Sequence, residues 1–166
     1  MILGMSVEAF TVLHVVITLV AIGSGLIVIG GMFASHKLPG TTALFLLTTA
    51  LTSLTGFLFP ITSFTPALGV GILACVILAI ALLALYKEHL VGAWRPIYVI
   101  TAIASLYLNV FVLVAQTFAK VSDLNALAPT QSESPFAVTQ AVVLAVFILM
   151  AVVAVVKFRP VTAVRL

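Results

Sequence analysis

The sequence predicts an all-α integral membrane bundle of five transmembrane helices, with the N-terminus outside and the C-terminus inside. Of its 166 residues, 64% are hydrophobic and only 7% are charged, whereas soluble domains are about 45–50% apolar and about 25% charged. Five apolar segments are each long enough to cross about 30 Å of hydrocarbon. The basic residues gather in the connections that one orientation places inside. Residues 1–166 are therefore expected to form a single transmembrane domain.

The first predicted span follows an N-terminus that lacks the features of a signal peptide. No Lys or Arg precedes its apolar run, and Glu8 lies just before it, whereas a signal peptide opens with a positively charged region. We therefore expect a retained helix. The five predicted spans cover about residues 9–33, 41–59, 66–86, 96–119 and 136–156.

Turn and cap residues separate these spans. Pro39-Gly40 forms a turn signal after the first span, and Pro96 follows the interfacial Trp94 at the start of the fourth. Thr65-Pro66 and Ser134-Pro135 each predict an N-cap residue followed by Pro at the first helical position.

The distribution of charge predicts the orientation and the partners. With the N-terminus outside, Lys120 is the only basic residue in an outside segment, and the opposite orientation would violate the positive-inside rule. Because the basic residues are scattered along the chain, we expect no nucleic-acid surface. The expected partners are membrane lipids and other integral membrane subunits, and the expected location is the cytoplasmic (inner) membrane of a bacterium. The six basic residues placed inside are Lys37, Lys87, Arg95, Lys157, Arg159 and Arg165.

The fourth predicted span carries a polar stripe. Because a helix advances about 100° per residue, six polar side chains of this span fall within an arc of about 100°. A face this polar is not expected to point at lipid, where unpaired polar groups are costly. Two interpretations stay open, namely helix packing through hydrogen bonds and the lining of a pocket. The stripe consists of Tyr98, Thr101, Ser105, Asn109, Gln116 and Lys120.

A second stripe, of hydroxyl side chains, runs along the second predicted span at Thr48, Thr52 and Thr55. Ser and Thr can return their hydroxyl to a carbonyl of their own helix, so this stripe is easily buried. It predicts helix–helix packing.

Depth along the spans predicts a pocket in the outer leaflet. Lys120 lies at the outer edge, Gln116 and Gln140 lie about 6 Å deeper, and His14 lies about 9 Å deep at about 1.5 Å per residue. Asn109 lies further down the same stripe. A ligand-binding pocket is therefore expected between the first, fourth and fifth spans, lined by these five residues. An ionisable residue inside a membrane is a functional-site hypothesis by default, although His14 could instead be satisfied by Gln116 or a backbone carbonyl.

Residues 121–135 form the longest connection and lie above this level, so they could fold down as a lid. A quinone or a lipid is the kind of ligand that such a pocket would take. No other cofactor is predicted.

Several kinds of chemistry are disfavoured by the spacing of the residues. His14 and His36 lie 22 residues apart on one helix or its end, which is about 33 Å along the axis, so they cannot face one another across a haem. No metal site is predicted, and no carboxylate lies in mid-membrane to relay protons. No catalytic residue can be named.

The motif His36-Lys-Leu-Pro-Gly40 followed by Leu54-Thr55-Gly56-Phe57 resembles the second span of small uncharacterised bacterial polytopic membrane proteins, of the domain-of-unknown-function type. The same span is also similar to cytochrome-b561-like bundles. That second resemblance implies a haem held by paired histidines on facing helices. This chain lacks such a pair.

Three functions follow from these observations. The sequence favours an accessory subunit or assembly partner of a membrane complex, because no catalytic motif is present. The first alternative is a binder of, or enzyme acting on, a lipid- or quinone-sized ligand in the outer-leaflet pocket. The second is a small transporter or channel that works as an oligomer. Enzymatic activity stays open, with the expectation leaning against it.

Overall fold

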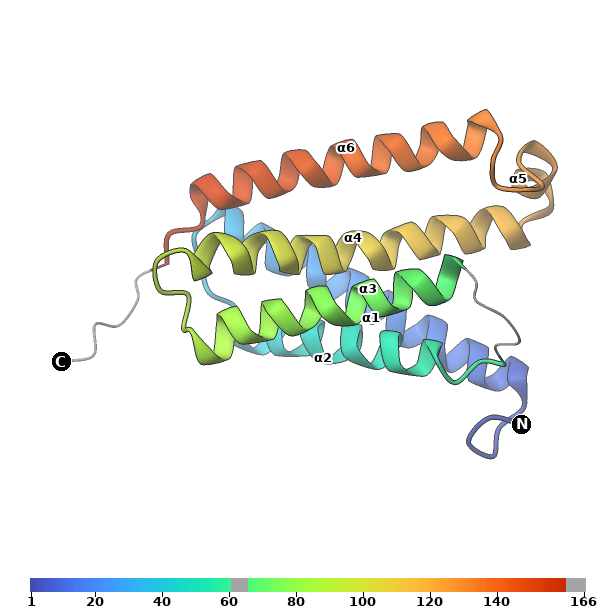
Figure 1. Ribbon diagram of the computed structural model, residues 1–166, viewed down its shortest axis with the longest axis horizontal. Coiled ribbons are helices and arrows are strands. Elements are labelled where there is room, and N and C mark those ends of the chain that lie inside the picture. The colour runs from blue at the N-terminus through green and yellow to red at the C-terminus, as the bar shows by residue number, and fades with distance from the viewer. Residues whose placement is uncertain (61–65, 161–166) are drawn as a thin grey trace.

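The computed structural model describes residues 1–60 and 66–160, and it confirms the all-α prediction. The described residues form five long helices and two short helical segments (Figure 1). Their bounds are α1 Val7–Phe33, α2 Pro39–Gly56, α3 Pro66–Leu82, the π-helical turn η1 Leu83–Lys87, α4 Trp94–Lys120, α5 Ser122–Leu127 and α6 Ser134–Lys157.

Four of these helices are long and apolar enough to cross a membrane, as an integral membrane protein requires. They cover Val7–Phe33, Leu68–Lys87, Trp94–Lys120 and Ser134–Lys157. The predicted span in α2 is not among them. Seven of the 18 residues of α2 carry a hydroxyl, which lowers its hydropathy below that of the other four helices.

The long helices lie side by side and alternate in direction (Figure 1). The start of α1, the end of α2, the start of α3 and the end of α4 therefore meet at one end of the bundle. α6 runs alongside α4, and the short α5 lies at the same end as the start of α1. Because the helices alternate in direction, these four helix ends surround the region where the sequence predicts the pocket.

Two helix starts differ from the sequence prediction. The N-cap of α6 is Glu133, not Ser134, which is already helical. The Glu133 carboxylate accepts hydrogen bonds from the Thr130 and Ser132 backbone N–H groups (3.2 and 3.1 Å), so it stabilises the turn that precedes the helix. α1 begins with a cap that was not predicted, at Ser6, whose Oγ accepts from the Ala9 N–H (3.1 Å). The other predicted cap, Thr65, lies outside the described residues.

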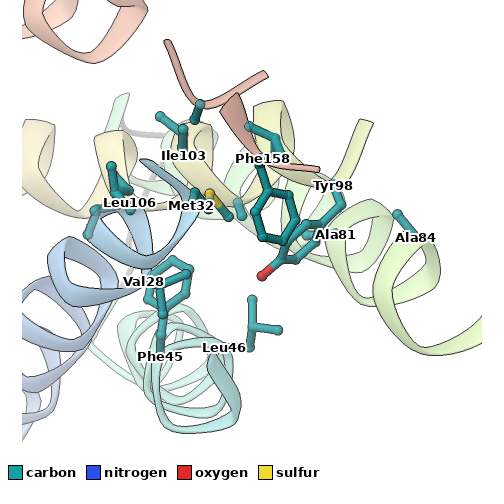
Figure 2. Packing of buried hydrophobic residues seen from close by; sticks show 14 of the residues in the cluster. Val28, Met32, Phe45, Leu46, Ala81, Ala84, Tyr98, Ile103, Leu106 and Phe158 are labelled. Atoms are coloured by element: carbon teal, nitrogen blue, oxygen red, sulfur yellow. The ribbon is translucent and has the colours of Figure 1, made fainter. Parts of the chain in front are cut away.

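A close-packed core fills the half of the bundle that contains the end of α1 and the start of α4 (Figure 2). Phe45, Met32 and Leu106 are almost fully buried there. Gly25 permits this packing, because a Cβ at that position would lie 2.7 Å from Leu106 Cδ1 and 2.9 Å from Phe45 Cε2. Small residues let helix backbones approach closely in this way.

Arg95 ties the end of α6 to the start of α4. Its Nη1 donates to the carbonyl oxygens of Val155 (3.2 Å) and Phe158. The last carbonyls of a helix have no partner within the helix, so the guanidinium satisfies groups that would otherwise be unpaired. The ring of Phe158 is buried beside Tyr98, with 6.3 Å between the ring centroids (Figure 2).

Candidate ligand cavity

A cavity of about 730 Å³ lies at the end of the bundle opposite the packed core. Its wall comes from the first half of α1, the end of α2 and the residues that follow it, the start of α3 and the second half of α4. The sequence predicts a pocket between the first, fourth and fifth spans. The fifth span, α6, contributes no residue to this wall, and α2 and α3 take its place. Four of the five predicted pocket residues line the cavity, namely His14, Asn109, Gln116 and Lys120.

His14 projects from α1 toward the end of α2. Its Nδ1 lies 2.8 Å from the Thr55 Oγ1. The ring also meets the Phe59 ring edge-on, with 5.4 Å between centroids and an interplanar angle of 89°. His14 thus has a hydrogen-bond partner within the protein, as the alternative interpretation held, but this partner is a hydroxyl from the neighbouring helix and neither Gln116 nor a backbone carbonyl.

Asn109 is the most deeply placed of the four polar side chains. It is only 5% exposed, and its Nδ2 donates to Thr49 Oγ1 (3.3 Å). This bond joins α4 to α2 at the inner end of the cavity. A buried amide needs such partners, since an unpaired polar group loses its hydration without compensation.

Gln116 and Lys120 lie one turn apart on α4 and are both exposed. Neither side chain has a partner in the part of the chain that the structure describes. Among the wall residues, Lys120 carries the only formal charge. The polar stripe of α4 thus brings an amide and a cation to the cavity with free donors.

Gln140 does not belong to this site. It is buried between α6 and α4, where its Nε2 donates to the Phe111 carbonyl (3.1 Å) and its Oε1 has no partner. Gln131 donates in the same way to the Ala115 carbonyl, one turn further along α4 (2.7 Å). Both amides hold the segment after α4 against the side of α4 that faces away from the cavity. Of the predicted lid, residues 121–135, only Val121 at its start lines the cavity, so the rest of that segment does not cover it.

The remaining part of the α4 stripe serves helix packing. Tyr98 and Ser105 are buried in the packed core, and the Thr101 hydroxyl returns to the Ile97 carbonyl (2.7 Å). The Ser105 Oγ is buried without a hydrogen-bond partner. The stripe therefore packs against other helices in the first half of α4 and lines the cavity in the second half, with Asn109 at the boundary.

The hydroxyl stripe of α2 also divides. Thr48 bonds to the Leu44 carbonyl of its own helix (2.7 Å) and packs, as expected. Thr52 lies in the cavity wall and within 3.3 Å of the Thr18 hydroxyl. Thr55 bonds to the Leu51 carbonyl (2.6 Å) as well as contacting His14. A helix surface expected only to pack thus supplies part of the site.

A smaller cavity of about 230 Å³ lies at the other end of the bundle, beside His36, Lys37 and Tyr98. His14 and His36 therefore border different cavities. Among the described residues, no group of three His, Cys, Asp or Glu side chains could hold a metal ion.

The contribution of α2 to the site could have been anticipated. α1 and α2 are joined by only a few residues, and short connections make neighbouring helices antiparallel. Residues at similar distances from this connection then lie near one another, within about one helical turn, which places Thr55 near His14. No family model, curated protein or solved structure matches this chain.

Proposed function

We propose that this protein is an integral membrane protein that binds one amphiphilic molecule, of lipid or quinone size, in the cavity between α1, α2, α3 and α4. The cavity is the observation that carries the proposal. Its volume of about 730 Å³ falls within the range of about 300–1,000 Å³ that is usual for small-molecule sites.

The composition of the wall fits an amphiphile. Valine, leucine and phenylalanine side chains make up much of it, including Val15, Leu19, Phe57 and Leu113. A few polar side chains stand among them, which is the usual pattern of a site that holds an apolar body and orients a polar head.

The cavity favours this function over the two others that the sequence allows. An accessory subunit needs helix surfaces that pack, but it has no need of a hollow of this size. A channel needs a polar path across the bilayer, whereas the α4 stripe enters the packed core at Ser105 and Tyr98. Ligand binding therefore replaces the accessory role as the leading function.

The proposal includes five spans, an outside N-terminus and the bacterial cytoplasmic membrane. The antiparallel course of α2 along α1 supports a fifth span (Figure 1), as do hydroxyls that bond within the helix and are thus tolerated in lipid. Lys37, Lys87 and Lys157 lie at or just beyond helix ends at the packed end of the bundle, which supports placing that end inside. A cysteine introduced at Asp123 should react with an impermeant reagent in intact cells, and one introduced at Lys157 should not, in a chain that carries Cys75→Ala.

A pair of substitutions on α3 tests the ligand cavity. Ala74 lines the cavity and is buried, whereas Ala79 lies outside the wall and is exposed. Ala74→Phe should fill part of the cavity, and Ala79→Phe adds the same ring to the same helix elsewhere. Each protein would be extracted from its own membrane and analysed by native mass spectrometry, which reports bound small molecules and protein partners together.

We expect the wild type and Ala79→Phe to retain an adduct of lipid or quinone mass, and Ala74→Phe to lose at least about nine-tenths of it. Equal occupancy in the two variants would contradict the proposal. If the protein instead carried stoichiometric protein partners and no small-molecule adduct, the result would favour an accessory subunit over a ligand-binding protein.

A further inference from the structure

The hydrogen bonds of Thr55 determine which nitrogen of His14 carries a proton. The Thr55 hydroxyl has one proton, and its Oγ1 lies 2.6 Å from the Leu51 carbonyl, which can only accept. That proton is therefore committed to the backbone. Oγ1 must then accept from His14 Nδ1 at 2.8 Å, so Nδ1 is the protonated nitrogen of the neutral ring. The tautomer of a histidine is set in this way by the partner of one nitrogen.

The other nitrogen of His14 is consequently an acceptor. In the neutral Nδ1–H ring, Nε2 bears a lone pair and no proton. No side chain or backbone group in residues 1–60 and 66–160 bonds to it. His14 therefore offers the cavity a hydrogen-bond acceptor, which distinguishes it from Gln116 and Lys120.

Those two groups bring donors to the same wall. The Lys120 ammonium has three N–H donors and no acceptor, and the Gln116 amide has two donors beside its carbonyl. Lys120 pairs with no acidic side chain in the described part of the chain. The cavity thus contains an unused acceptor on α1 and an unused cationic donor on α4.

We propose that the occupant is a long-chain carboxylic acid whose head lies between His14 and Lys120, an inference that rests on the proposed function. One carboxyl oxygen shares its proton with His14 Nε2, and the other oxygen accepts from the Lys120 ammonium. The net charge of the pair is the same whether the proton rests on oxygen or on nitrogen. The apolar wall takes the acyl chain.

Quinones, esters and alcohols match these two side chains less completely. A quinone or an ester has only acceptor oxygens, so it brings no proton to Nε2. An alcohol has a single neutral oxygen, which would have to donate to Nε2 and accept from Lys120 at the same time. A carboxylic acid matches both groups at once, and hydrogen bonds to charged groups are stronger than those between neutral groups.

Competition among three probes with the same C18 chain tests the head group. Full-length protein in phosphatidylcholine nanodiscs would receive equal amounts of oleic acid, oleyl alcohol and methyl oleate, and native mass spectrometry would count each bound species. We expect oleic acid to bind at least about tenfold more tightly than either competitor, since a hydrogen bond to a charged group contributes about 1.5–3 kcal/mol. Methyl oleate should bind least.

Three variants assign the preference to the named residues. Lys120→Met should abolish the advantage of oleic acid over oleyl alcohol, and Lys120→Arg should retain most of it. Thr55→Val removes the acceptor that fixes the Nδ1 proton, so it should reduce the preference for the two hydroxyl-bearing probes over methyl oleate several-fold. Thr48→Val makes the same change on α2 outside the cavity wall, and it should leave the preference unchanged.

The outcomes separate this inference from the proposed function. Equal binding of the three probes, or tighter binding of decylubiquinone than of oleic acid, overturns the carboxylic-acid assignment but leaves an amphiphile-binding cavity. Absence of every probe from the wild-type protein overturns both. A preference for oleic acid that survives both Lys120→Met and Thr55→Val shows that the head lies elsewhere and also refutes the assignment.

Discussion

The two ends of this bundle treat their polar side chains in opposite ways. At the packed end, Tyr98 and Ser105 are buried among apolar side chains, and Arg95 is bonded to the end of α6. At the hollow end, Gln116 and Lys120 lie in a cavity wall, and their side chains have no hydrogen-bond partner among the described residues. The same stripe of α4 supplies residues to both ends, so one amphipathic helix provides structure in one half and a binding surface in the other.

This difference indicates where stability and function reside. In lipid, helices associate through close packing and hydrogen bonds, because the hydrocarbon removes most of the hydrophobic driving force. The half that contains Phe45 and Gly25 provides that packing. The half that contains His14 lacks it and has space for a ligand. Substitutions should therefore lower the free energy of unfolding mainly at the packed end and ligand occupancy mainly at the hollow end.

The largest expected effect comes from removing a phenylalanine at each end. Phe45 is 1% exposed in the packed core, whereas Phe57 lies in the cavity wall. Phe45→Ala should lower the free energy of unfolding by about 3 kcal/mol, because it opens a cavity in close-packed surroundings. Phe57→Ala should lower it by less than about 1 kcal/mol, since it only enlarges an existing space. Equilibrium unfolding in mixed detergent micelles measures both, and equal losses would remove the distinction between the two ends.

Arg95 should have the next largest effect. Arg95→Ala leaves the carbonyls of Val155 and Phe158 without the guanidinium donor, and we expect a loss of about 2 kcal/mol. Arg159→Ala is the matched control, because Arg159 is exposed and its side chain makes one weaker bond, to the Val156 carbonyl (3.3 Å). Similar unfolding curves for the two variants would show that Arg95 does not hold α6.

Two glycines on α1 test how closely this helix approaches its neighbours, with a smaller expected effect on stability. Gly25→Ala should lower the free energy of unfolding by about 1–2 kcal/mol, because the new Cβ would crowd Leu106 and Phe45. Gly23→Ala meets nothing within 4 Å, so it should be neutral or stabilise α1 by up to about 1 kcal/mol through helix propensity. Melting temperatures in detergent distinguish the two, and stabilisation by Gly25→Ala would show that α1 does not approach its neighbours this closely.

Ser105 should give the smallest effect, and one of opposite sign. Ser105→Ala removes a buried hydroxyl that has no partner, so stability should be unchanged or rise by up to about 1 kcal/mol. Thr49→Val is the contrasting change, because it removes the acceptor of the Asn109 amide and should reduce stability. A clear loss in Ser105→Ala would mean that its hydroxyl has a partner in the membrane.

Much of the fold follows from the sequence, because long apolar runs in lipid can satisfy their backbone only as helices. The bounds of α1 and α4 lie within two residues of those predicted. The short α5 was missed because its sequence, Ser122–Leu127, carries no apolar period. The π-helical turn at Leu83–Lys87 also gave no signal.

The site was only partly predictable, for a geometric reason. Position along a helix fixes the depth of a side chain, but not the direction in which it points around the bundle. Lys120 and Gln116 lie on a face that the α4 stripe itself defines, so sequence could identify them. Gln140 has a similar depth but belongs to α6, which packs on another side of α4. The pairing of His14 with Thr55 required combining depth with the antiparallel course of α1 and α2.

The position of Thr55 in the final turn of α2 has one more consequence. Its hydroxyl can accept from the imidazole only while the Leu51 carbonyl takes its proton, and α2 ends at the next residue, Gly56. Fraying of that single turn would release the hydroxyl to donate, and the ring of His14 would then exchange its donor and acceptor nitrogens. The order of the last turn of α2 therefore determines which nitrogen of His14 donates a hydrogen bond and which one accepts.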